Sequence, residues 1–406
     1  MVITIALIAA ACSSGSSGDD SPSEASGEEE GRLVPTAQVV FSGPGDAPGD
    51  TPTKLLAVGE VDGRLFAGGY LGIPARDCGV PWLMVSDDDG ASWQDQSEVV
   101  NPAAQCGTIR TVLPDPAGGV LLVGDLEGDE GGITVWRSAD GQVWDHDVSR
   151  VDDQPDIPIG GIPEGLLYDG QLLIVDACSH LLDTASGSPE VVGNIGFDQE
   201  AVTSLTDGRV VAGGFGGSDG CYEGETDSES AMVGISEDGG RTWEQAELPA
   251  GSPADMPSGA GSVLADGNLI VGGTGFDGSN LSPVGWTLQE GWQRFEFPDG
   301  GTWSSVNGFV NNASTSDRWI VAYGGARFYD PDTDGRGTWY SCDAGDSWTS
   351  FPMPLVSEAE ANEFTITDAR LVGDSIVASG YEEYGSEYST RGVVWRIDLP
   401  EDGCSS

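Results

Sequence analysis

A short pattern recurs about every 52 residues along most of this chain. The pattern is a tight turn followed by an apolar strand, as in residues 62–69, DGRLFAGG. Copies begin at Asp62, Gly118, Asp169, Asp207, Asp266, Asp317 and Gly373. A repeated unit of this size buries its apolar surface only against neighbouring units. The spacing therefore predicts a row or a closed ring of similar units.

Each unit contains the sequence of four short strands. A stretch of alternating polarity, such as TIRTVLP at 108–114, precedes the turn and the apolar strand, and a variable loop, a third strand, an acidic turn and a last strand follow. Four short strands joined in this way predict one antiparallel sheet. Apolar triplets such as LIV at 269–271 indicate a strand that is covered on both faces. We therefore predict an all-β fold, a seven-bladed β-propeller with almost no helix.

The acidic turn recurs in four units, at 86–93, 138–144, 236–243 and 341–348. The third copy reads SEDGGRTW. A catalytic group is needed once, whereas a structural turn is needed in every unit, so the repetition favours architecture. A carboxylate can accept hydrogen bonds from the amides of its own turn, and Gly tolerates a positive φ. Trp is then expected to pack as a wedge between neighbouring sheets.

These turns resemble Asp-boxes, also called BNR repeats, which occur in sialidase-like β-propellers. The resemblance implies that each turn lies between the third and fourth strands, away from the binding funnel. It also implies a structural role for eight residues: Asp88, Trp93, Asp140, Trp144, Asp238, Trp243, Asp343 and Trp348.

Seven second strands are present, but only six complete fourth strands follow them. Residues 33–41, LVPTAQVVF, precede the first unit and could supply the missing strand. We therefore expect the N-terminal strand to close the last blade, which would remove an exposed sheet edge.

The N-terminus resembles that of bacterial lipoproteins. Residues 1–12 read as a lipoprotein signal peptide whose lipobox ends at Cys12, and residues 13–31 form an acidic Ser/Gly tether that we expect to be disordered. The propeller then spans residues 32–406. The implied location is the outer face of the bacterial cytoplasmic membrane, with the lipid on Cys12 as the only membrane contact.

The charge of the chain limits its partners. A formal net charge of −51 repels phosphate backbones and anionic lipid headgroups, which argues against nucleic-acid or membrane-surface binding. We expect a monomer that binds a glycan or a protein. The charge could also serve solubility alone.

Six cysteines remain after Cys12, and in an exported chain they predict three disulfides. Six cysteines allow 15 pairings. In a propeller, the loops between second and third strands share a face with the connections between blades. This placement predicts the pairs Cys78–Cys106, Cys178–Cys221 and Cys342–Cys404.

Candidate catalytic residues come from polar positions of the first strands, which face the central funnel. They are Arg110, Glu164, Glu200, Asn307 and Asp368. Two carboxylates there could hydrolyse a glycosidic bond, so a glycoside hydrolase is the alternative function. The sialidase entry motif is incomplete, because GIPARD has Gly72 where that family has Arg. The other interpretation is that these residues only solvate the channel, and we predict a binding or scaffold module without catalysis.

One metal site is a further candidate. The stretch DPDTDG places Asp330, Asp332 and Asp334 at the spacing that opens a calcium loop. Ser341 stands where such a loop would have its bidentate Glu, so the alternative is a solvated acidic turn.

The partner is expected on the face with the long loops. Rigid sheets that carry variable loops commonly bind partners there. Aromatic side chains that could stack on a sugar or a protein surface are Tyr70, Tyr222, Phe328, Tyr329, Tyr381 and Tyr384. Ordinary loop composition would account for them equally well.

Overall fold

The computed structural model describes residues 35–43, 52–72, 78–126, 132–149, 164–175, 180–183, 190–205, 207–215, 231–251, 255–263, 269–276, 281–298, 304–311, 319–327, 337–356, 361–384 and 389–400. These residues belong to one compact unit, Val34–Ser406. Among them, no helix is long and apolar enough to cross a membrane. The one described helix, α1 (Ser97–Val100), has four residues.

The described strands form five four-stranded antiparallel sheets and one larger sheet. The first two sheets are β2 (Thr53–Val61), β3 (Arg64–Gly72), β4 (Gly79–Ser86) and β5 (Gln94–Asp95), then β6 (Gly107–Pro114), β7 (Val120–Leu126), β8 (Gly132–Ser138) and β9 (Asp145–Ser149). The third and fourth are β10 (Glu164–Tyr168), β11 (Gln171–Val175), β12 (His180–Asp183) and β13 (Glu190–Asn194), then β14 (Asp198–Ser204), β15 (Val210–Phe215), β16 (Ala231–Ser236) and β17 (Glu244–Glu247). The fifth is β18 (Met256–Val263), β19 (Leu269–Phe276), β20 (Leu281–Leu288) and β21 (Trp292–Glu296).

The larger sheet has eight strands. One part contains β22 (Ser304–Asn311), β23 (Ile320–Arg327), β24 (Thr338–Ser341) and β25 (Thr349–Ser350). The other contains β26 (Ala361–Val372), β27 (Ser375–Tyr384), β28 (Ser389–Asp398) and the N-terminal strand β1 (Thr36–Ser42). The two parts join where residues 325–327 at the end of β23 pair with residues 363–365 of β26.

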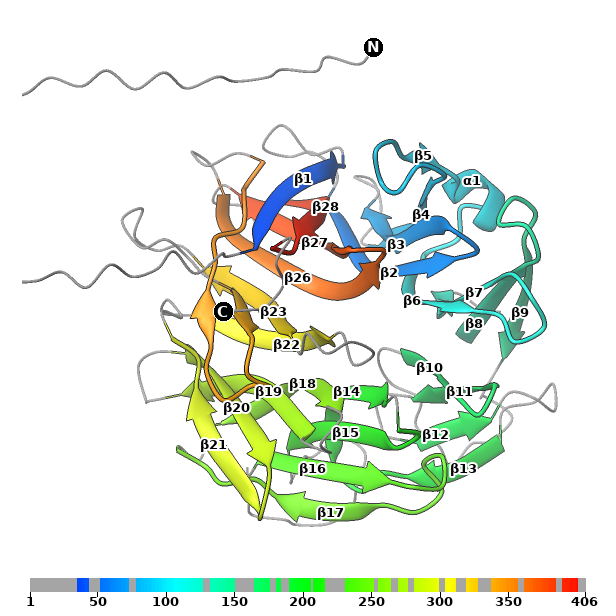
Figure 1. Cartoon of the computed structure of the whole chain (residues 1–406). Helices are drawn as coiled ribbons and strands as arrows, with labels where there is room; N and C mark the ends of the chain where they lie inside the picture. Colours follow the sequence, from blue (N-terminus) through cyan, green and yellow to red (C-terminus); the bar gives the residue numbers. More distant parts are fainter. Residues whose placement is uncertain are drawn as a thin grey trace, which may run out of the picture. The chain divides into compact units, whose positions relative to one another are not determined.

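The first strands of successive sheets, here called the inner strands, contact one another in a closed cycle. The contacts run from β2 to β6, β10, β14, β18, β22 and β26, and β26 contacts β2 again. Figure 1 shows the sheets set around a common centre, with the inner strands facing it. The protein is thus all-β with a β-propeller arrangement.

The inner strands share a bulge. In six of the seven inner strands one residue is unpaired, at Leu56, Arg110, Glu200, Ser258, Asn307 and Thr367. On the second strand, a glycine lies opposite the residue that precedes the bulge, as with Gly69 and Gly124. A Cβ atom on either glycine would lie 1.9 Å from a carbonyl oxygen of the inner strand. The glycines that end the repeated apolar strand are therefore needed for this close approach.

The N-terminal strand β1 pairs antiparallel with β28, from Thr36 opposite Asp398 to Ser42 opposite Val393. The sequence predicted this pairing. Phe41 of β1 also packs against two tryptophans of the first sheet, Trp82 and Trp93. The strand thus covers the edge of β28 and contacts the sheet that follows it around the ring.

Candidate functional site

The acidic turn at 236–243 is held by its own side chains. The buried hydroxyl of Ser236 accepts the amide of Gly240 at 2.7 Å and donates to Asp238 at 2.9 Å. The carboxylate of Asp238 accepts the amide and the hydroxyl of Thr242, at 2.8 and 2.7 Å. The indole of Trp243 donates to the Gly240 carbonyl at 2.8 Å. In this turn the side chains of the serine, the aspartate, the threonine and the tryptophan all bond within the turn.

The turns at 86–93 and 341–348 use the same serine and aspartate bonds. In all three turns the glycine four residues after the serine, Gly90, Gly240 or Gly345, has a positive φ, of 86°, 82° and 92°. The turn at 138–144 is one residue shorter, and its serine makes a single bond, from Ser138 to Asp140 at 3.3 Å. The shorter turn is therefore the least constrained of the four.

The pKa of each turn carboxylate is lowered: Asp88, Asp140, Asp238 and Asp343. At Asp238 the largest cause is the hydrogen bond from the Thr242 hydroxyl. At Asp343 burial is the largest single cause and raises the pKa. The hydrogen bonds, chiefly from Ser347, together outweigh burial, so the pKa is lowered. These carboxylates are ionised acceptors at neutral pH, which suits a structural role.

The turns also contact the neighbouring sheet. Arg64, at the start of β3, pairs with Asp87 in its own sheet and donates to the carbonyl of Asp140 in the next one. Tyr168 at the end of β10 donates in the same way to the carbonyl of Glu237 at 3.3 Å. The acidic turns thus lie at joints between sheets and not at the inner strands.

All five funnel candidates lie on inner strands. Arg110, Glu200 and Asn307 are bulge residues, Asp368 follows the bulge of β26, and Glu164 begins β10. The side chains of Glu164 and Glu200 lie outside the described part of the structure. The other three are described, and each contacts a neighbouring residue.

Asn307 joins two inner strands. Its side-chain amide donates to the carbonyl of Ile366 on β26 at 2.9 Å. In the same way the hydroxyl of Thr367 donates to the carbonyl of Leu55 on β2 at 2.9 Å. Bulge residues therefore hold adjacent inner strands in register.

The carboxylate of Asp368 has three partners, one of which is the backbone amide of Ala369 at 2.9 Å. One carboxylate oxygen accepts the amide of Val58 on β2 at 3.1 Å, and the other pairs with Arg370 at 2.7 Å. Burial raises the pKa of Asp368. The charge of Arg370 and the hydrogen bonds from backbone amides act in the opposite direction but are smaller, so the pKa is raised overall. On β6, Arg110 lies 3.9 Å from the carboxylate of Asp125. The described candidates thus do not include two carboxylates that face each other.

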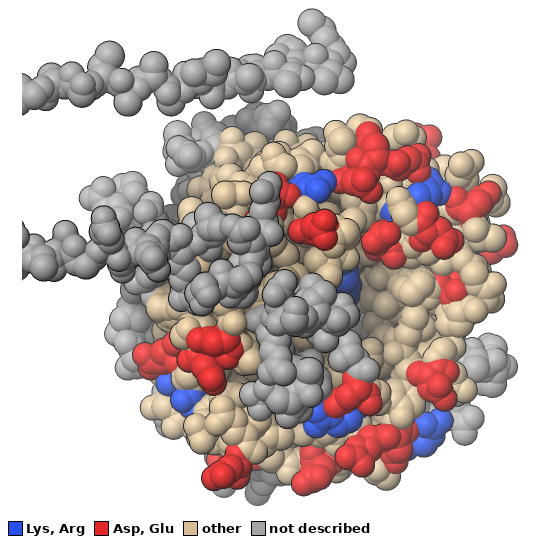
Figure 2. Space-filling view, in the orientation of Figure 1, with Lys and Arg blue, Asp and Glu red and all other residues tan. Residues whose placement is uncertain are grey.

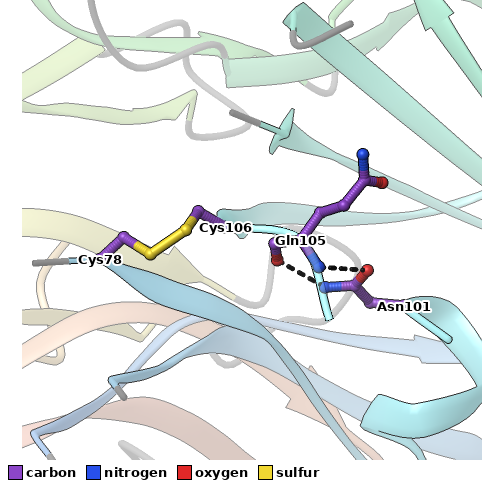
Figure 3. The surroundings of a disulfide bond; sticks show 4 residues. All are labelled: Cys78, Asn101, Gln105 and Cys106. Atoms are coloured by element: carbon purple, nitrogen blue, oxygen red, sulfur yellow. Dashed lines mark hydrogen bonds between the residues drawn. A yellow bond between two sulfur atoms is a disulfide. The ribbon is translucent and has the colours of Figure 1, made fainter. Parts of the chain in front are cut away.

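One predicted disulfide is confirmed. Cys78, just before β4, is bonded to Cys106, just before β6, with Cα atoms 5.7 Å apart (Figure 3). Asn101 and Gln105 close the connecting segment with two hydrogen bonds, of 2.7 and 3.1 Å. The disulfide fixes the start of one sheet to the third strand of the preceding sheet.

Several predicted residues lie outside the described part of the chain. They are Cys12, Cys178, Cys221, Cys404, Asp330, Asp332, Asp334, Tyr222, Phe328 and Tyr329. Cys342 is disulfide-bonded, but its predicted partner Cys404 is in this group. Within the described ranges, no three His, Cys, Asp or Glu residues are placed to hold a metal ion.

The described aromatic candidates lie where second strands end. Tyr70 is near the end of β3, and Tyr381 and Tyr384 are near the end of β27. The ammonium of Lys54 lies 3.9 Å from the centre of the Tyr381 ring. Figure 2 shows carboxylates across the visible face, a hollow near its middle, and Lys or Arg atoms at the edge of that hollow.

A second set of tryptophans was missed from the sequence. Five third strands carry a fully buried tryptophan: Trp82, Trp136, Trp286, Trp339 and Trp395. The last four donate from the indole to a backbone carbonyl of the connection that leads into their own sheet, at 2.7 to 3.0 Å. The sequence signal for them is a tryptophan that recurs in the third strand of five units.

No family model matches this chain, and no curated protein matches it. Among solved structures, "YCF48 bound to D1 peptide" has a TM-score of 0.54 at 14% identity and covers 91% of this chain and 97% of that chain. An α-L-arabinanase from Penicillium chrysogenum, complexed with arabinobiose, has a TM-score of 0.49 at 15% identity and covers 90% and 99%. A sialidase from Trypanosoma rangeli, complexed with the inhibitor DANA, has a TM-score of 0.44 at 15% identity and covers 86% and 55%.

These similarities concern the fold. The inner-strand cycle and the first of these structures define the chain as a β-propeller protein.

Proposed function

We propose that this protein is a lipid-anchored, extracytoplasmic seven-bladed β-propeller that binds a glycan or a protein and does not catalyse a reaction. The count of seven is supported by the five four-stranded sheets and by the division of the eight-stranded sheet into two sets of four. The closed cycle of inner-strand contacts agrees with it. The four acidic turns are proposed to be Asp-boxes.

The contacts of Asp368 favour binding over catalysis. Asp368, an inner-strand candidate with a described carboxylate, uses both of its oxygens on the protein itself, at Val58 and Arg370. A glycosidase needs one carboxylate free to attack or to activate water and another to protonate the leaving group. Asp368 instead ties the last inner strand to the first.

The proposed partner binds on the side where the second strands end. Tyr70 and Tyr381 are partly exposed there, and long connections leave the sheets on that side. YCF48 holds a peptide in its solved complex, which is compatible with a protein partner for a chain of similar fold.

The anchor is proposed from the sequence alone. Cys12 follows three alanines, and an acidic, Ser/Gly-rich segment of 19 residues separates it from the propeller. Metabolic labelling with a fatty-acid alkyne should mark the wild-type protein and not a Cys12→Ser variant. A Cys12→Ser protein that stays in the membrane fraction would contradict the anchor.

The binding function is tested by exposing the purified protein to glycan and peptide arrays and to chromogenic glycosides. We expect a retained partner and no turnover. Asp368→Asn should lower the melting temperature without creating or removing any turnover.

A glycoside hydrolase is the second candidate, because burial raises the pKa of Asp368. A raised pKa is a property of carboxyls that act as general acids. Turnover that is lost in folded Asp368→Asn or Glu164→Gln protein would favour the hydrolase and reject the binding-only function.

A further inference from the structure

Lys54 is the only lysine among the 406 residues, in a chain with 67 acidic residues. It lies in β2, two residues before the bulge at Leu56. The ion pairs found in the described part of the structure all use arginine, and Lys54 takes part in none. Among the described residues, the Lys54 ammonium therefore pairs with no carboxylate.

The contact of Lys54 is aromatic. Its nitrogen lies 3.9 Å from the centre of the Tyr381 ring. The negative face of a phenol ring attracts an ammonium but uses none of its hydrogen atoms in a strong hydrogen bond. The hydrogens that point away from the ring can therefore be donated to a ligand.

Tyr70 lies opposite Lys54 on the neighbouring strand. Lys54 and Tyr70 are directly opposite in the antiparallel pair of β2 and β3, so their side chains share one face of the sheet. Both side chains are partly exposed, as is that of Tyr381. Across the described residues, the hydroxyls of Tyr70 and Tyr381 have no hydrogen-bond partner.

The next inner strand adds a second cation. Thr108 of β6 and Lys54 of β2 are equivalent, since the carbonyl of each faces a glycine of its second strand, Gly124 or Gly69. Arg110 follows Thr108 by two residues and lies 3.9 Å from Asp125, the residue opposite Thr108. The guanidinium of Arg110 thus extends toward Asp125, which lies opposite the position that is equivalent to Lys54.

We propose that Lys54, Tyr381 and Tyr70 bind one oxyanion group, a carboxylate or a phosphate, of the partner. This inference rests on the proposed binding function. A ligand with one charged group fits better than a polyanion. The net charge of −51 repels extended anions, whereas the hydrogen-bond donors of the site act only at contact. The unpaired ammonium and the two phenol hydroxyls together supply the hydrogen-bond donors that such a group needs.

The single lysine makes a direct test possible. Protein labelled with ¹³C and ¹⁵N only in lysine gives one side-chain signal, that of Lys54. The labelled full chain is titrated with sodium acetate and with sodium phosphate, and with sodium chloride at equal ionic strength. We expect a saturable shift of the Lys54 signal with acetate or phosphate and none with chloride. A response equal to that of chloride would overturn the site.

Two variants test the geometry. Tyr381→Leu keeps the lysine and removes the ring, and we expect binding to weaken about threefold, as for loss of an exposed cation–π contact. Lys54→Gln should abolish the rise in melting temperature that the bound oxyanion causes. Arg241→Gln, which removes an exposed cation from an acidic turn, is the control of equal charge and should keep that rise. Equal losses in both charge variants would reduce the effect to net charge and overturn the proposal.

Failure of this site is distinct from failure of the binding function. If an array partner binds but neither it nor the oxyanions shift the Lys54 signal, the site is wrong and the binding function stands. If oxyanions shift the signal saturably while the arrays stay empty, the site stands and the proposed partner class is wrong.

Discussion

The carboxylate of Asp368 accepts a hydrogen bond from the backbone amide of Val58 at 3.1 Å, although 310 residues of chain separate them. The bond joins the inner strand of the last sheet to that of the first. The hydroxyl of Thr367 donates to the carbonyl of Leu55 in the same joint, at 2.9 Å. Hydrogen bonds from side chains therefore connect the last sheet to the first, in addition to the pairing of β1 with β28.

Replacing Asp368 by Ala should destabilise this joint. The change leaves the Val58 amide without its acceptor and Arg370 without its counter-ion, so we expect the free energy of unfolding to fall by about 1–3 kcal/mol. Urea unfolding measures the loss. Asp374→Ala, in the exposed hairpin between β26 and β27, is the control and should change stability by less than about 0.5 kcal/mol. Equal stability of the two variants would contradict this role of Asp368.

The stability of the folded protein should depend on pH through Glu382. It is buried opposite Arg391 in the pair of β27 and β28, and burial raises its pKa above 4.5, against the hydrogen bond from Val356 and the charge of Arg391. The folded state therefore holds this proton at a higher pH than the unfolded state does. The stability that Glu382 contributes is full below about 4.5 and is lost as the pH rises through its folded pKa.

The measurement compares wild-type protein with Glu382→Gln, by urea unfolding between about pH 4 and pH 8. The stability of the wild type relative to the variant should fall as the pH rises, because only the wild type loses the proton. A relative stability that grows with pH would mean that the ion pair with Arg391 outweighs burial.

The serines of the acidic turns should differ in importance. The hydroxyl of Ser236 accepts the buried amide of Gly240, whereas that of Ser138 makes one bond of 3.3 Å. Ser236→Ala leaves a buried amide unsatisfied and should cost about 1–2 kcal/mol, and Ser138→Ala should cost less. Thermal unfolding of the two variants tests this. A larger loss for Ser138→Ala would show that the bond to the amide is not what stabilises the turn.

The disulfide between Cys78 and Cys106 closes a segment with a sequence separation of 28. By the entropy of loop closure, removing the bond should lower the free energy of unfolding by about 3–4 kcal/mol. Denaturant unfolding of a Cys78→Ser, Cys106→Ser double variant measures this loss. Reductant should lower the stability of the wild type further than that of the variant, and an unchanged wild type would show that the bond contributes little.

The N-terminal strand should be required by the whole ring. Deleting residues 36–42 exposes the edge of β28 and removes Phe41 from Trp82 and Trp93. We expect a lower melting temperature and association between molecules through the free edge. Deletion of residues 13–31 is the control and should leave the melting temperature unchanged. Equal melting temperatures for wild type and both deletions would contradict the closing role of β1.

Much of the fold could be predicted from local sequence. The turn at 236–243 uses bonds between residues two to four positions apart, so its pattern was readable without the fold. The pairing of β1 followed from a missing strand in the repeat. The roles of Asn307 and Asp368 could not be read in this way, because their partners are on other sheets. Both were candidates for chemistry and are found to join inner strands.

The sequence by itself determined the repeating unit, the order of its strands and the chemistry of its turns, because these depend on contacts between residues near each other in the chain. Only the tertiary structure decided which polar groups are used by the protein and which remain for a partner. Asp368 is satisfied by an amide 310 residues away, whereas Lys54 rests on a tyrosine ring. The difference arises because ring closure brings the last sheet against the first, and no local pattern records which side chains then meet.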